Sequence, residues 1–504
     1  IDPDAAPGNR EIRVKTNSGL TNPLCFQVGT LPEISEEQFG DPSKKGTIQA
    51  AVPAILNGQI QPGEIDSFKF QARSGQDLVI QTYARSLVPY IGDAVPGWFQ
   101  ATLVLYDSKG NEMAFADDYN FDPDPVLHYK IPKDDEYKLQ INDSIYRGRD
   151  DFVYRIEVSE KPFVTALFPL GGKESAITQA AVSGWNIKQK QIELDTLPTN
   201  EHIRHTVFEQ DNLLSNKILY AVDNLNECIE NEDNNTQDSA QSVALPIIVN
   251  GRIAEPGDTD VFSFLAKAGD DLVAEVCARR LNSTMDSLLK LTDSDGQVLE
   301  LNDDYNCKKT GLQTHFADSY IHAKLPKDGT YFLHLSDSQD HGGLEYGYRL
   351  RISPPMPDYK LFVTPCSLNM IAGLSDPLRV EALRKDGFSG EIKLSLKDAP
   401  AGFKLSGERI PAGCDSVWVT LQAPAKAAKE PVEIKIEGRA STAEQLLDRP
   451  AIPSRDMMQA FIYQHLVPSS QLMVNVTAPR RKAPNIFFTD RSEEHTSELQ
   501  SPNT

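Results

Sequence analysis

Hydrophobic and polar residues alternate along much of this chain. In residues 66–72 and again in residues 260–266, hydrophobic side chains recur at every second position, the spacing that places them on one face of a β-strand. Short hydrophobic runs such as residues 77–83 follow, and turn sequences such as Ser74-Gly75 separate them. Many short strands with frequent turns are typical of β-sandwiches. The pattern therefore predicts an all-β protein.

The same pattern occurs twice. Asn57-Gly58 recurs as Asn250-Gly251, and further matches follow in register: Asp66 with Asp260, Ala84-Arg85 with Ala278-Arg279, Asp117-Asp118 with Asp303-Asp304, and Tyr154-Arg155 with Tyr348-Arg349. The period is far longer than the roughly 20–50 residues of a solenoid repeat. It fits a duplicated domain, or a duplicated pair of domains.

The repeat sets the expected domain boundaries. We expect a tandem array of β-sandwiches, because the turn and strand signals persist throughout the chain. The expected divisions are 1–30 (the end of a small β domain), 31–159 (first sandwich), 160–226 (small β domain), 227–354 (second sandwich), 355–478 (a different β domain), 479–490 (a linker) and 491–504. The last segment resembles the translation of a sequencing adapter, so we expect it to lie outside the natural protein and the chain to be a fragment.

Composition narrows the classes of partner. The net charge of −22 disfavours nucleic acid, whose phosphates an acidic surface repels, and favours attraction of cations. Hydrophobic runs fall short of the roughly 20 residues that span a bilayer. The six cysteines do not occupy matched positions in the two repeats, which predicts mostly isolated thiols. Pairing of Cys366 with Cys414 stays open.

An oxygen-rich segment precedes the second sandwich. It contains Glu230, Glu232, Asn234 and Asn235. Ca²⁺ takes about 6–8 oxygen ligands, and a linker that folds back onto the sandwich would share such an ion with Asp260. A solvated acidic linker without a metal accounts for the same residues.

Several stretches of the second repeat resemble the bacterial pre-peptidase C-terminal domain family. They are 250–253, 256–264, 286–296, 302–304 and 325–331, and the first repeat is similar. The resemblance implies two jelly-roll-like β-sandwiches, usually extracellular and non-catalytic, often joined to secreted peptidases and binding collagen in some members. It also implies a Ca²⁺ site between linker and sandwich, with the ligands falling on Glu230, Glu232, Asn234, Asn235 and Asp260.

The first repeat departs from this ligand pattern. It keeps Glu36, Asp41 and Asp66, but Gln38 and Gly40 replace a carboxylate and an amide. Calcium affinity depends on ligand charge and number, so the resemblance implies a weak or lost site there.

Two further resemblances are looser. Residues 160–226 and 355–478 are similar to immunoglobulin-like domains, and residues 1–30 resemble the end of one. The arrangement resembles large surface or secreted proteins of Planctomycetes-type bacteria, which implies an extracellular, cell-surface or periplasmic location.

Catalytic motifs are not recognisable in the sequence. The adjacent carboxylates of Asp303-Asp304 would point to opposite faces of a strand, whereas a glycosidase needs two facing carboxyls, so we interpret them as an acidic turn. His315, Asp318 and Ser319 are close in sequence, but a triad depends on three-dimensional geometry. We therefore expect no enzyme within this fragment.

Two functions remain open at this point. One is a non-catalytic extracellular array for binding, adhesion or scaffolding, stiffened by Ca²⁺, with a protein or polysaccharide as partner. The other is the ancillary, substrate-targeting region of a secreted peptidase or other hydrolase whose catalytic domain lies outside the fragment. Tyr119, Tyr305 and Tyr346 would form a polymer-binding face or pack at sandwich edges. The oligomeric state stays open.

Overall fold

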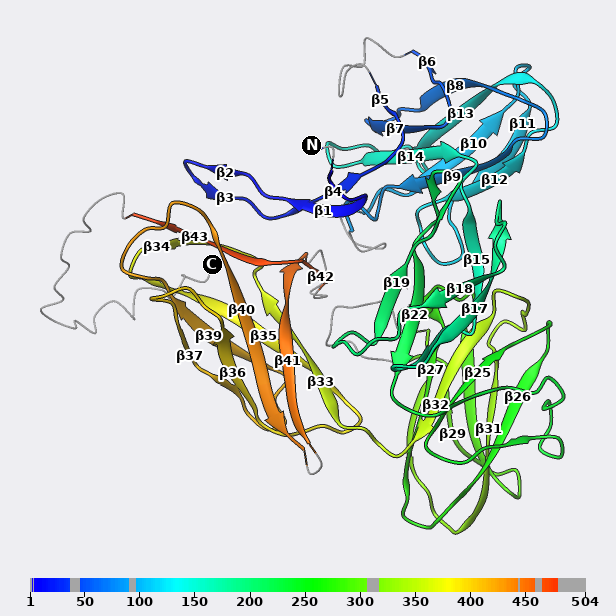
Figure 1. Ribbon diagram of the computed structural model, residues 1–504, viewed down its shortest axis with the longest axis vertical. Coiled ribbons are helices and arrows are strands. Elements are labelled where there is room, and N and C mark those ends of the chain that lie inside the picture. The colour runs from blue at the N-terminus through cyan, green and yellow to red at the C-terminus, as the bar shows by residue number, and fades with distance from the viewer. Residues whose placement is uncertain are drawn as a thin grey trace, which may run out of the picture.

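The computed structural model of the protein describes residues 2, 4–36, 46–89, 97–305, 317–442, 445–457 and 465–478 (Figure 1). The expected segments 479–490 and 491–504 lie outside the described residues, as do Asp41 and His315. The described chain is nearly all β and includes a short 3₁₀ turn, η2 (Arg279–Leu281). This confirms the predicted all-β fold. Within the described part, no helix is long and apolar enough to cross a membrane.

The first sandwich consists of two five-stranded sheets. One sheet has the order β11 (Glu112–Ala116), β10 (Ala101–Tyr106), β13 (Asp135–Asp143), β8 (Asp66–Ala72), β6 (Ile48–Gln49). The other has the order β12 (Val126–Lys130), β9 (Asp77–Tyr83), β14 (Val153–Ser159), β7 (Ala54–Gln59), β5 (Glu33–Ser35). Side chains of both sheets form one core, in which Phe68 of β8 joins Leu56 of β7. The alternation in residues 66–72 thus becomes burial of every second residue.

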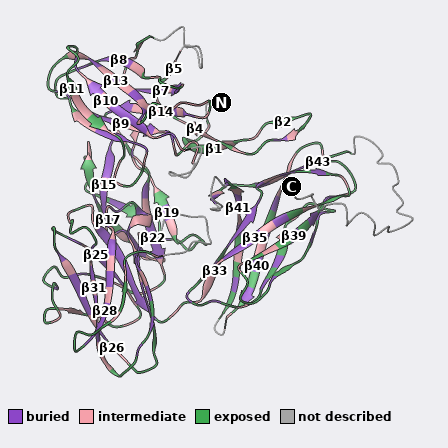
Figure 2. Cartoon of the chain, turned by 180° about the vertical axis from the view of Figure 1, so that it is seen from behind, coloured by how far each residue is buried: buried purple, intermediate pink, exposed green. Residues whose placement is uncertain are grey.

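The second sandwich has the same strand order. Its sheets are β29 (Val298–Asn302), β28 (Ser287–Asp293), β31 (Gly329–Asp337), β26 (Thr259–Ala266), β24 (Gln241–Ser242) and β30 (Tyr320–Lys324), β27 (Asp271–Cys277), β32 (Gly347–Ser353), β25 (Ile247–Arg252), β23 (Glu227–Ile229). In both sandwiches the two short strands that come first in the chain pair in parallel at the sheet edges, and the other pairs are antiparallel. Figure 2 shows the buried positions along the strands of both sandwiches.

A small β domain lies between the two sandwiches. Its sheets are β15 (Phe163–Phe168), β17 (Thr178–Trp185), β18 (Gln191–Leu194) and β16 (Gly171–Lys173), β22 (Ile218–Asp223), β19 (Ile203–Thr206), with a hairpin of β20 (Glu209–Gln210) and β21 (Leu213–Leu214). Trp185 stacks on His128 of the first sandwich, with ring centroids 4.5 Å apart. Tyr119 packs edge-on against Phe163 and Trp185.

The last domain is a larger β-sheet structure around its own core. Its strands are β34 (Ser367–Ile371), β43 (Leu472–Thr477), β40 (Val432–Ser441), β41 (Leu446–Asp456), β33 (Asp358–Thr364), β35 (Ser375–Lys385), β39 (Ser416–Gln422), β37 (Lys404–Ser406), β36 (Ile392–Lys397), β38 (Arg409–Ile410) and β42 (Leu466–Pro468). Cys366 is buried and Cys414 exposed, and both thiols are free. The disulfide that the sequence left open between them is therefore not formed.

The chain begins with two hairpins that reach the last domain. They are β1 (Gly8–Ile12) with β4 (Leu24–Val28), and β2 (Lys15–Thr16) with β3 (Gly19–Leu20). The β2–β3 hairpin extends toward β43 (Figure 1). There the Leu20 amide donates to Asn369 Oδ1 at 2.7 Å, and Asn369 Nδ2 donates to the Leu20 carbonyl at 2.9 Å. The first and last parts of the described chain thus touch.

Candidate metal centre

The linker strand β23 brings its following residue, Glu230, against the second sandwich. β23 pairs in parallel with β25, and the Glu230 amide donates to the Asn250 carbonyl at 3.0 Å. Farther along, the Val261 amide of β26 donates to the Asn234 carbonyl at 2.9 Å. These backbone bonds place Glu230 and Asn234 beside Asp260. All three are buried, with exposed fractions of 7%, 1% and 1% respectively.

The hydroxyl of Tyr348 lies between the two carboxyl groups. Tyr348 Oη is 2.5 Å from Glu230 Oε2 and 2.7 Å from Asp260 Oδ2. A phenol has one proton to donate, so it satisfies only one of the two oxygens. The other carboxyl needs a proton of its own or a cation nearby. The backbone amide of Arg252 donates to the remaining Glu230 oxygen, Oε1, at 2.5 Å.

Gly251 leaves the space in which these groups meet. A Cβ atom there would lie 2.1 Å from Glu230 Oε2 and 2.2 Å from the Tyr348 ring. The Asn-Gly repeat therefore has a steric reason, because any side chain at this position would push the tyrosine and the carboxylate apart. Gly58 keeps the same space beside Tyr154 in the first sandwich, where a Cβ would lie 2.2 Å from the hydroxyl.

Burial changes the acidity of this pair. It raises the pKa of Glu230, and it raises the pKa of Asp260 further because the Glu230 charge adds to the desolvation of Asp260. Without a bound cation the two carboxyls therefore hold a proton between them at neutral pH. The pKa of Tyr348 lies well above its usual value for the same reasons, burial first and then the charge of Asp260. Tyr348 is thus a hydrogen-bond donor throughout the physiological range.

The side-chain amide of Asn234 determines which oxygen atoms the site offers to a cation. One terminal atom lies 2.8 Å from the Asn231 carbonyl oxygen and 3.0 Å from Asp260 Oδ1. If that atom is the amide nitrogen, it donates to both oxygens. If it is the amide oxygen, three oxygens converge, an arrangement that needs a cation among them. Carboxylate, amide and carbonyl oxygens are the ligands that Ca²⁺ prefers, so the donor set fits this ion.

The five predicted ligands do not all lie together. Glu230, Asn234 and Asp260 are brought into one buried cluster, whereas Glu232 and Asn235 are exposed. The Glu232 charge nevertheless contributes to raising the pKa of Glu230. Among the described residues, no group of three His, Cys, Asp or Glu side chains is arranged to hold a metal ion. The buried cluster therefore offers two carboxylates plus neutral oxygens.

The first sandwich contains the matching arrangement in a more open form. The Gln59 amide donates to Glu36 Oε1 at 3.0 Å, and Tyr154 Oη donates to Asp66 Oδ2 at 2.7 Å. Burial and then the charge of Asp66 raise the pKa of Glu36 to about 7. Glu36 and Asp66 are only partly buried, and the third predicted residue, Asp41, lies outside the described part of the chain.

The tyrosine and the arginine of the repeated Tyr-Arg pair both belong to the site, although the sequence pattern predicted a role for neither. Arg349 is 2% exposed. It pairs with Asp223, the last residue of β22, at 3.0 Å and with Glu227, the first residue of the linker strand β23, at 2.6 Å. Arg155 binds Glu33 at 2.9 Å in the first sandwich. The tyrosine caps the carboxyl group and the arginine holds the linker strand. Their recurrence at one register was the signal that could have revealed both roles.

The repeated Ala-Arg pair marks a structural turn. Asp318 Oδ1 accepts the amides of Ala278 at 3.0 Å and Arg279 at 2.7 Å, and Asp124 accepts those of Ala84 and Arg85 in the first sandwich. Ser319 Oγ donates to the Ser287 carbonyl at 2.6 Å. Asp318 and Ser319, which are close in sequence to His315, therefore both make structural hydrogen bonds to the backbone.

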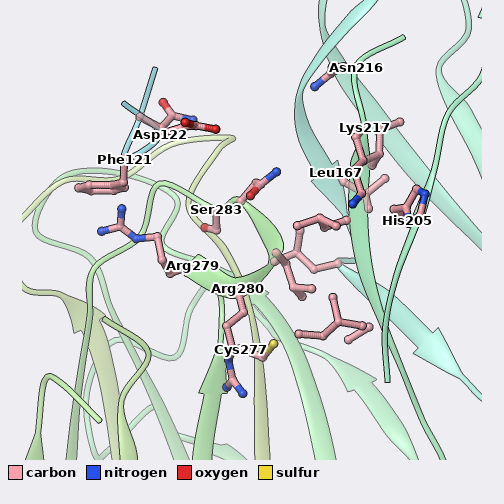
Figure 3. Close-up of a pocket in the computed structure, with 18 of the residues that line it drawn as sticks. Phe121, Asp122, Leu167, His205, Asn216, Lys217, Cys277, Arg279, Arg280 and Ser283 are labelled. Carbon is pink, nitrogen blue, oxygen red and sulfur yellow. The ribbon is translucent and has the colours of Figure 1, made fainter. Parts of the chain in front are cut away.

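A cavity with a volume of about 2100 Å³ lies among the domains (Figure 3). Arg279 lies against the Phe121 ring there, and burial lowers the pKa of its guanidinium to about 10. Burial raises the pKa of the Cys277 thiol to about 12, and since the thiolate is the reactive form, this cysteine is a poor nucleophile. Across the cavity, burial lowers the pKa of Lys217, and burial followed by the Lys217 charge lowers that of His205.

Part of the second sandwich is similar to a known protein family. Residues 258–337, from just before β26 to the end of β31, match the family model of the bacterial pre-peptidase C-terminal domain. A segment of 83 residues is 46% identical to a probable subtilase-type serine protease of Deinococcus radiodurans. That match covers 16% of this chain and 10% of the relative, so the chain corresponds to a small part of that protein.

Solved structures give weaker likenesses. A DUF4785 family protein of Legionella pneumophila is 10% identical, with a TM-score of 0.15 over 40% of this chain and 60% of that one. Domains 1–6 of the surface layer protein SbsC are 10% identical, with a TM-score of 0.16 over 82% of this chain and 54% of that one. Scores this low carry no argument about function.

Proposed function

We propose that this chain is an ancillary, non-catalytic region of a secreted bacterial peptidase of the subtilase type. The observation that carries the proposal is the family match of residues 258–337, together with the 46% identity to a probable subtilase-type serine protease. In this role the β domains bind or position a protein substrate for a catalytic domain outside the chain. The acidic surface, with a net charge of −22, is compatible with secretion.

The first sandwich is proposed to belong to the same family as the second. Both have the same strand order, the same Asn-Gly contact with a buried tyrosine, and the same clamp of an arginine on the linker strand. The intervening and last domains are proposed to be immunoglobulin-like modules that space the two sandwiches. On this view the boundaries follow the repeat, near residues 30, 159, 226 and 354.

Calcium is proposed to bind where the linker meets the second sandwich. Glu230, Asp260 and Asn234 would hold the ion, with Glu232 and Asn235 supplying further oxygens from the exposed side. When bound, the cation would neutralise two buried carboxyls that otherwise share a proton. The linker strand and the sandwich would then be tied by an ion as well as by Arg349. The first site, around Glu36 and Asp66, would bind weakly or not at all.

A scaffold or adhesion role is the second candidate. It is favoured by the ionic junction between the second sandwich and the last domain. Arg351 of β32 binds Glu275 at 2.8 Å and Asp386 of the last domain at 2.7 Å, and Asp386 is 4% exposed. A buried junction of this kind resists bending, which suits a spacer at a cell surface.

The test of the ancillary role uses the whole chain. The protein is incubated with a fluorophosphonate probe for serine hydrolases, and separately with insoluble collagen, elastin or chitin followed by sedimentation. We expect sedimentation with a protein polymer and no covalent labelling. Labelling abolished by a single Ser→Ala change would show that the chain is itself an enzyme. Sedimentation with chitin alone would favour the scaffold role at a polysaccharide surface.

A further inference from the structure

The turn that follows β13 in the first sandwich recurs after β31 in the second. Both turns contain a left-handed residue at the same place, Tyr146 with φ of 58° and Asp340 with φ of 59°. Asp143 and Asp337, the last residues of the two strands, accept the amide of the residue four positions later, at 3.0 Å in each case. Because the two turns share these features, the side chains that they carry can be compared position by position.

In the first sandwich a guanidinium group occupies this turn. Arg147 Nε donates to Asp143 Oδ1 at 3.1 Å, and Arg147 Nη2 donates to Asp143 Oδ2 at 3.0 Å. Nη2 also donates to the Trp98 carbonyl at 3.0 Å, and the guanidinium carbon lies 5.8 Å from the centre of the Phe152 ring. A carboxylate, a carbonyl oxygen and an aromatic ring thus hold one planar cation.

The second sandwich keeps the carboxylate and the ring but has no arginine in this turn. Asp337 is 4% exposed, and Tyr346 follows it at the spacing at which Phe152 follows the aspartate of the first sandwich. His341 takes the place of Arg147. The His341 ring lies edge-on to the Tyr346 ring, with centroids 6.4 Å apart. The group that fills the turn in the first sandwich therefore has no equivalent in the second.

A second carboxylate adds negative charge at the same place. The amide of Asp286, just before β28, donates to Asp337 Oδ1 at 2.8 Å, as the amide of Gln100, just before β10, donates to Asp143 Oδ2 at 3.2 Å. Asp286 thus stands where the first sandwich has a neutral amide. Its carboxylate accepts the Ser338 hydroxyl at 2.8 Å. Compared with the first sandwich, the second has one carboxylate more and one guanidinium fewer.

Asp286 and Asp337 line a pocket with a volume of about 220 Å³. The exposed residues Gln339 and His341 line it as well, so the pocket is reached from solvent. Thr284 also lines it, and the buried Thr284 hydroxyl oxygen has no hydrogen-bond partner among the described residues. The volume is below the roughly 300–1,000 Å³ of clefts that hold drug-sized ligands. It suits the end of a single side chain.

Arg279 is the cation of this chain that acts on the pocket. The charges of Asp286 and Asp337 both oppose the effect of burial on the Arg279 pKa. The Arg279 guanidinium lies against the ring of Phe121, which also lines the pocket (Figure 3). Within the described ranges, Arg279 forms no ion pair with either carboxylate. The pocket therefore offers two carboxylates that no cation of the described chain pairs with.

We propose that this pocket takes an arginine side chain of a bound polypeptide. The guanidinium pairs with Asp337 as Arg147 pairs with Asp143, and Asp286 supplies the second carboxylate. The planar fork of a guanidinium matches a carboxylate with two hydrogen bonds, which an ammonium group does not. The net charge of −22 attracts basic polypeptides to the protein. This inference rests on the proposed function, in which the β domains bind a protein substrate, and it names arginine-containing polypeptides as the class.

The test compares three fluorescein-labelled peptides on the complete chain. They share the sequence Gly-Ser-X-Gly-Ser, in which X is arginine, lysine or citrulline, the neutral side chain closest in shape to arginine. Fluorescence anisotropy at low salt measures the dissociation constants. We expect the arginine peptide to bind about tenfold or more tightly than the citrulline peptide, because hydrogen bonds between charged groups are the stronger ones. The lysine peptide should bind more weakly than the arginine peptide.

Three variants locate the binding. Asp286→Asn should weaken binding of the arginine peptide by about fivefold or more. Asp340→Asn is the matched control, because it removes the same charge from an exposed residue of the turn, and asparagine tolerates the left-handed backbone. It should leave the binding unchanged. His341→Arg supplies a guanidinium from the chain itself, as Arg147 does, and should abolish binding without lowering the melting temperature.

Each result decides the proposal. Equal binding of the citrulline or the lysine peptide overturns it, and so do equal losses in Asp286→Asn and Asp340→Asn, which would assign the binding to general surface charge. Undiminished binding or a lower melting temperature in His341→Arg also overturns it. Sedimentation with a protein polymer but no binding of any peptide overturns the pocket alone and leaves the ancillary role standing. Fluorophosphonate labelling overturns the ancillary role and leaves the peptide result unchanged.

Discussion

At the scale of single residues, the chain places two carboxyl groups where water does not reach them. Glu230 and Asp260 share the single proton of the Tyr348 hydroxyl. Their raised pKa values follow from burial, with mutual repulsion adding to it at Asp260. The unfolded chain has ordinary carboxyl pKa values near about 4. Folding therefore takes up protons at neutral pH.

This uptake predicts how stability depends on pH in a chelator. Both carboxyl pKa values are higher in the folded chain than in the unfolded chain. The stabilisation that comes from proton uptake is therefore complete below about pH 4, and it is lost as the pH rises toward the pKa values of the folded chain. We expect the free energy of unfolding in EDTA to fall from pH 5 to 8, and to fall less steeply in Asp260→Asn. The slope is at most about 1.4 kcal/mol per pH unit for each proton taken up. Urea denaturation at a series of pH values measures it.

Calcium should reverse this behaviour, since the ion binds the deprotonated carboxyls. In the wild-type chain we expect Ca²⁺ to raise the melting temperature more at pH 8 than at pH 5.5. Asp260→Asn should abolish the increase, whereas Asp66→Asn in the first sandwich should leave it unchanged. Equal increases in all three proteins, measured by scanning calorimetry, would place the calcium site elsewhere.

Gly251 gives a steric prediction. Gly251→Ala sets a methyl group against the Tyr348 ring and the Glu230 carboxylate. We expect a loss of about 1–3 kcal/mol in the free energy of unfolding, as overpacking of a core commonly costs. Gly46→Ala is the control, because a Cβ atom at residue 46 would have no other atom within 4 Å. Similar losses in both variants would show that the cost does not come from the contact between residue 251 and Tyr348.

At the scale of elements, each sandwich holds its own linker as an edge strand. β5 and β23 pair in parallel with β7 and β25. Arg155 of β14 and Arg349 of β32, each one strand further into the sheet, bind an acidic residue of the linker strand. The two clamps differ in depth. Arg349 and Glu227 are 2% and 18% exposed in their side chains, whereas Arg155 and Glu33 are 14% and 45% exposed.

Because the two ion pairs differ in burial, we expect that breaking them lowers the free energy of unfolding by different amounts. Arg349→Met leaves Asp223 and Glu227 without their cation, and we expect a loss of about 3–5 kcal/mol, as for a broken buried ion pair. Arg155→Met should cost about 1 kcal/mol or less, because the Glu33 carboxylate remains hydrated. Hydrogen exchange at β23 and β5, together with urea denaturation, measures both. Equal losses would contradict the role of burial.

At the scale of the whole molecule, ionic contacts join one domain to the next. Asp386 receives Arg351 Nη1 at 2.7 Å, the Tyr320 hydroxyl at 3.0 Å and the Met356 amide at 2.8 Å. Lys385 adds a contact of 2.8 Å with Glu275. The second sandwich and the last domain are therefore joined by buried charges as well as by the chain.

Neutralising Asp386 should loosen this junction. Asp386→Asn keeps the shape of the side chain and its left-handed backbone, with φ of 51°, but removes the charge opposite Arg351. We expect a larger radius of gyration in small-angle scattering and faster proteolysis near residues 354–357. Asp448→Asn, which breaks the exposed pair with Arg439, is the control and should change neither.

The strands of this protein follow from local alternation, and so the all-β fold was predictable. Residues 66–72 and 260–266 bury every second side chain as their pattern predicts. The repeat also identified Asp260, Gly251 and Tyr348 as matched positions, because equal register in sequence became equal register in the sheets. The similarity of residues 258–337 to the pre-peptidase C-terminal domain family could also be recognised from the sequence of this segment.

The sequence by itself determined which residues form strands and which positions recur, because backbone pairing depends on nearby turns and alternation. Only the tertiary structure decided that Tyr348 lies between Glu230 and Asp260, that Glu232 and Asn235 stay exposed, and that Cys366 and Cys414 are free thiols. These outcomes depend on strands distant in the chain meeting face to face. The desolvation that raises the carboxyl pKa values arises only from that meeting.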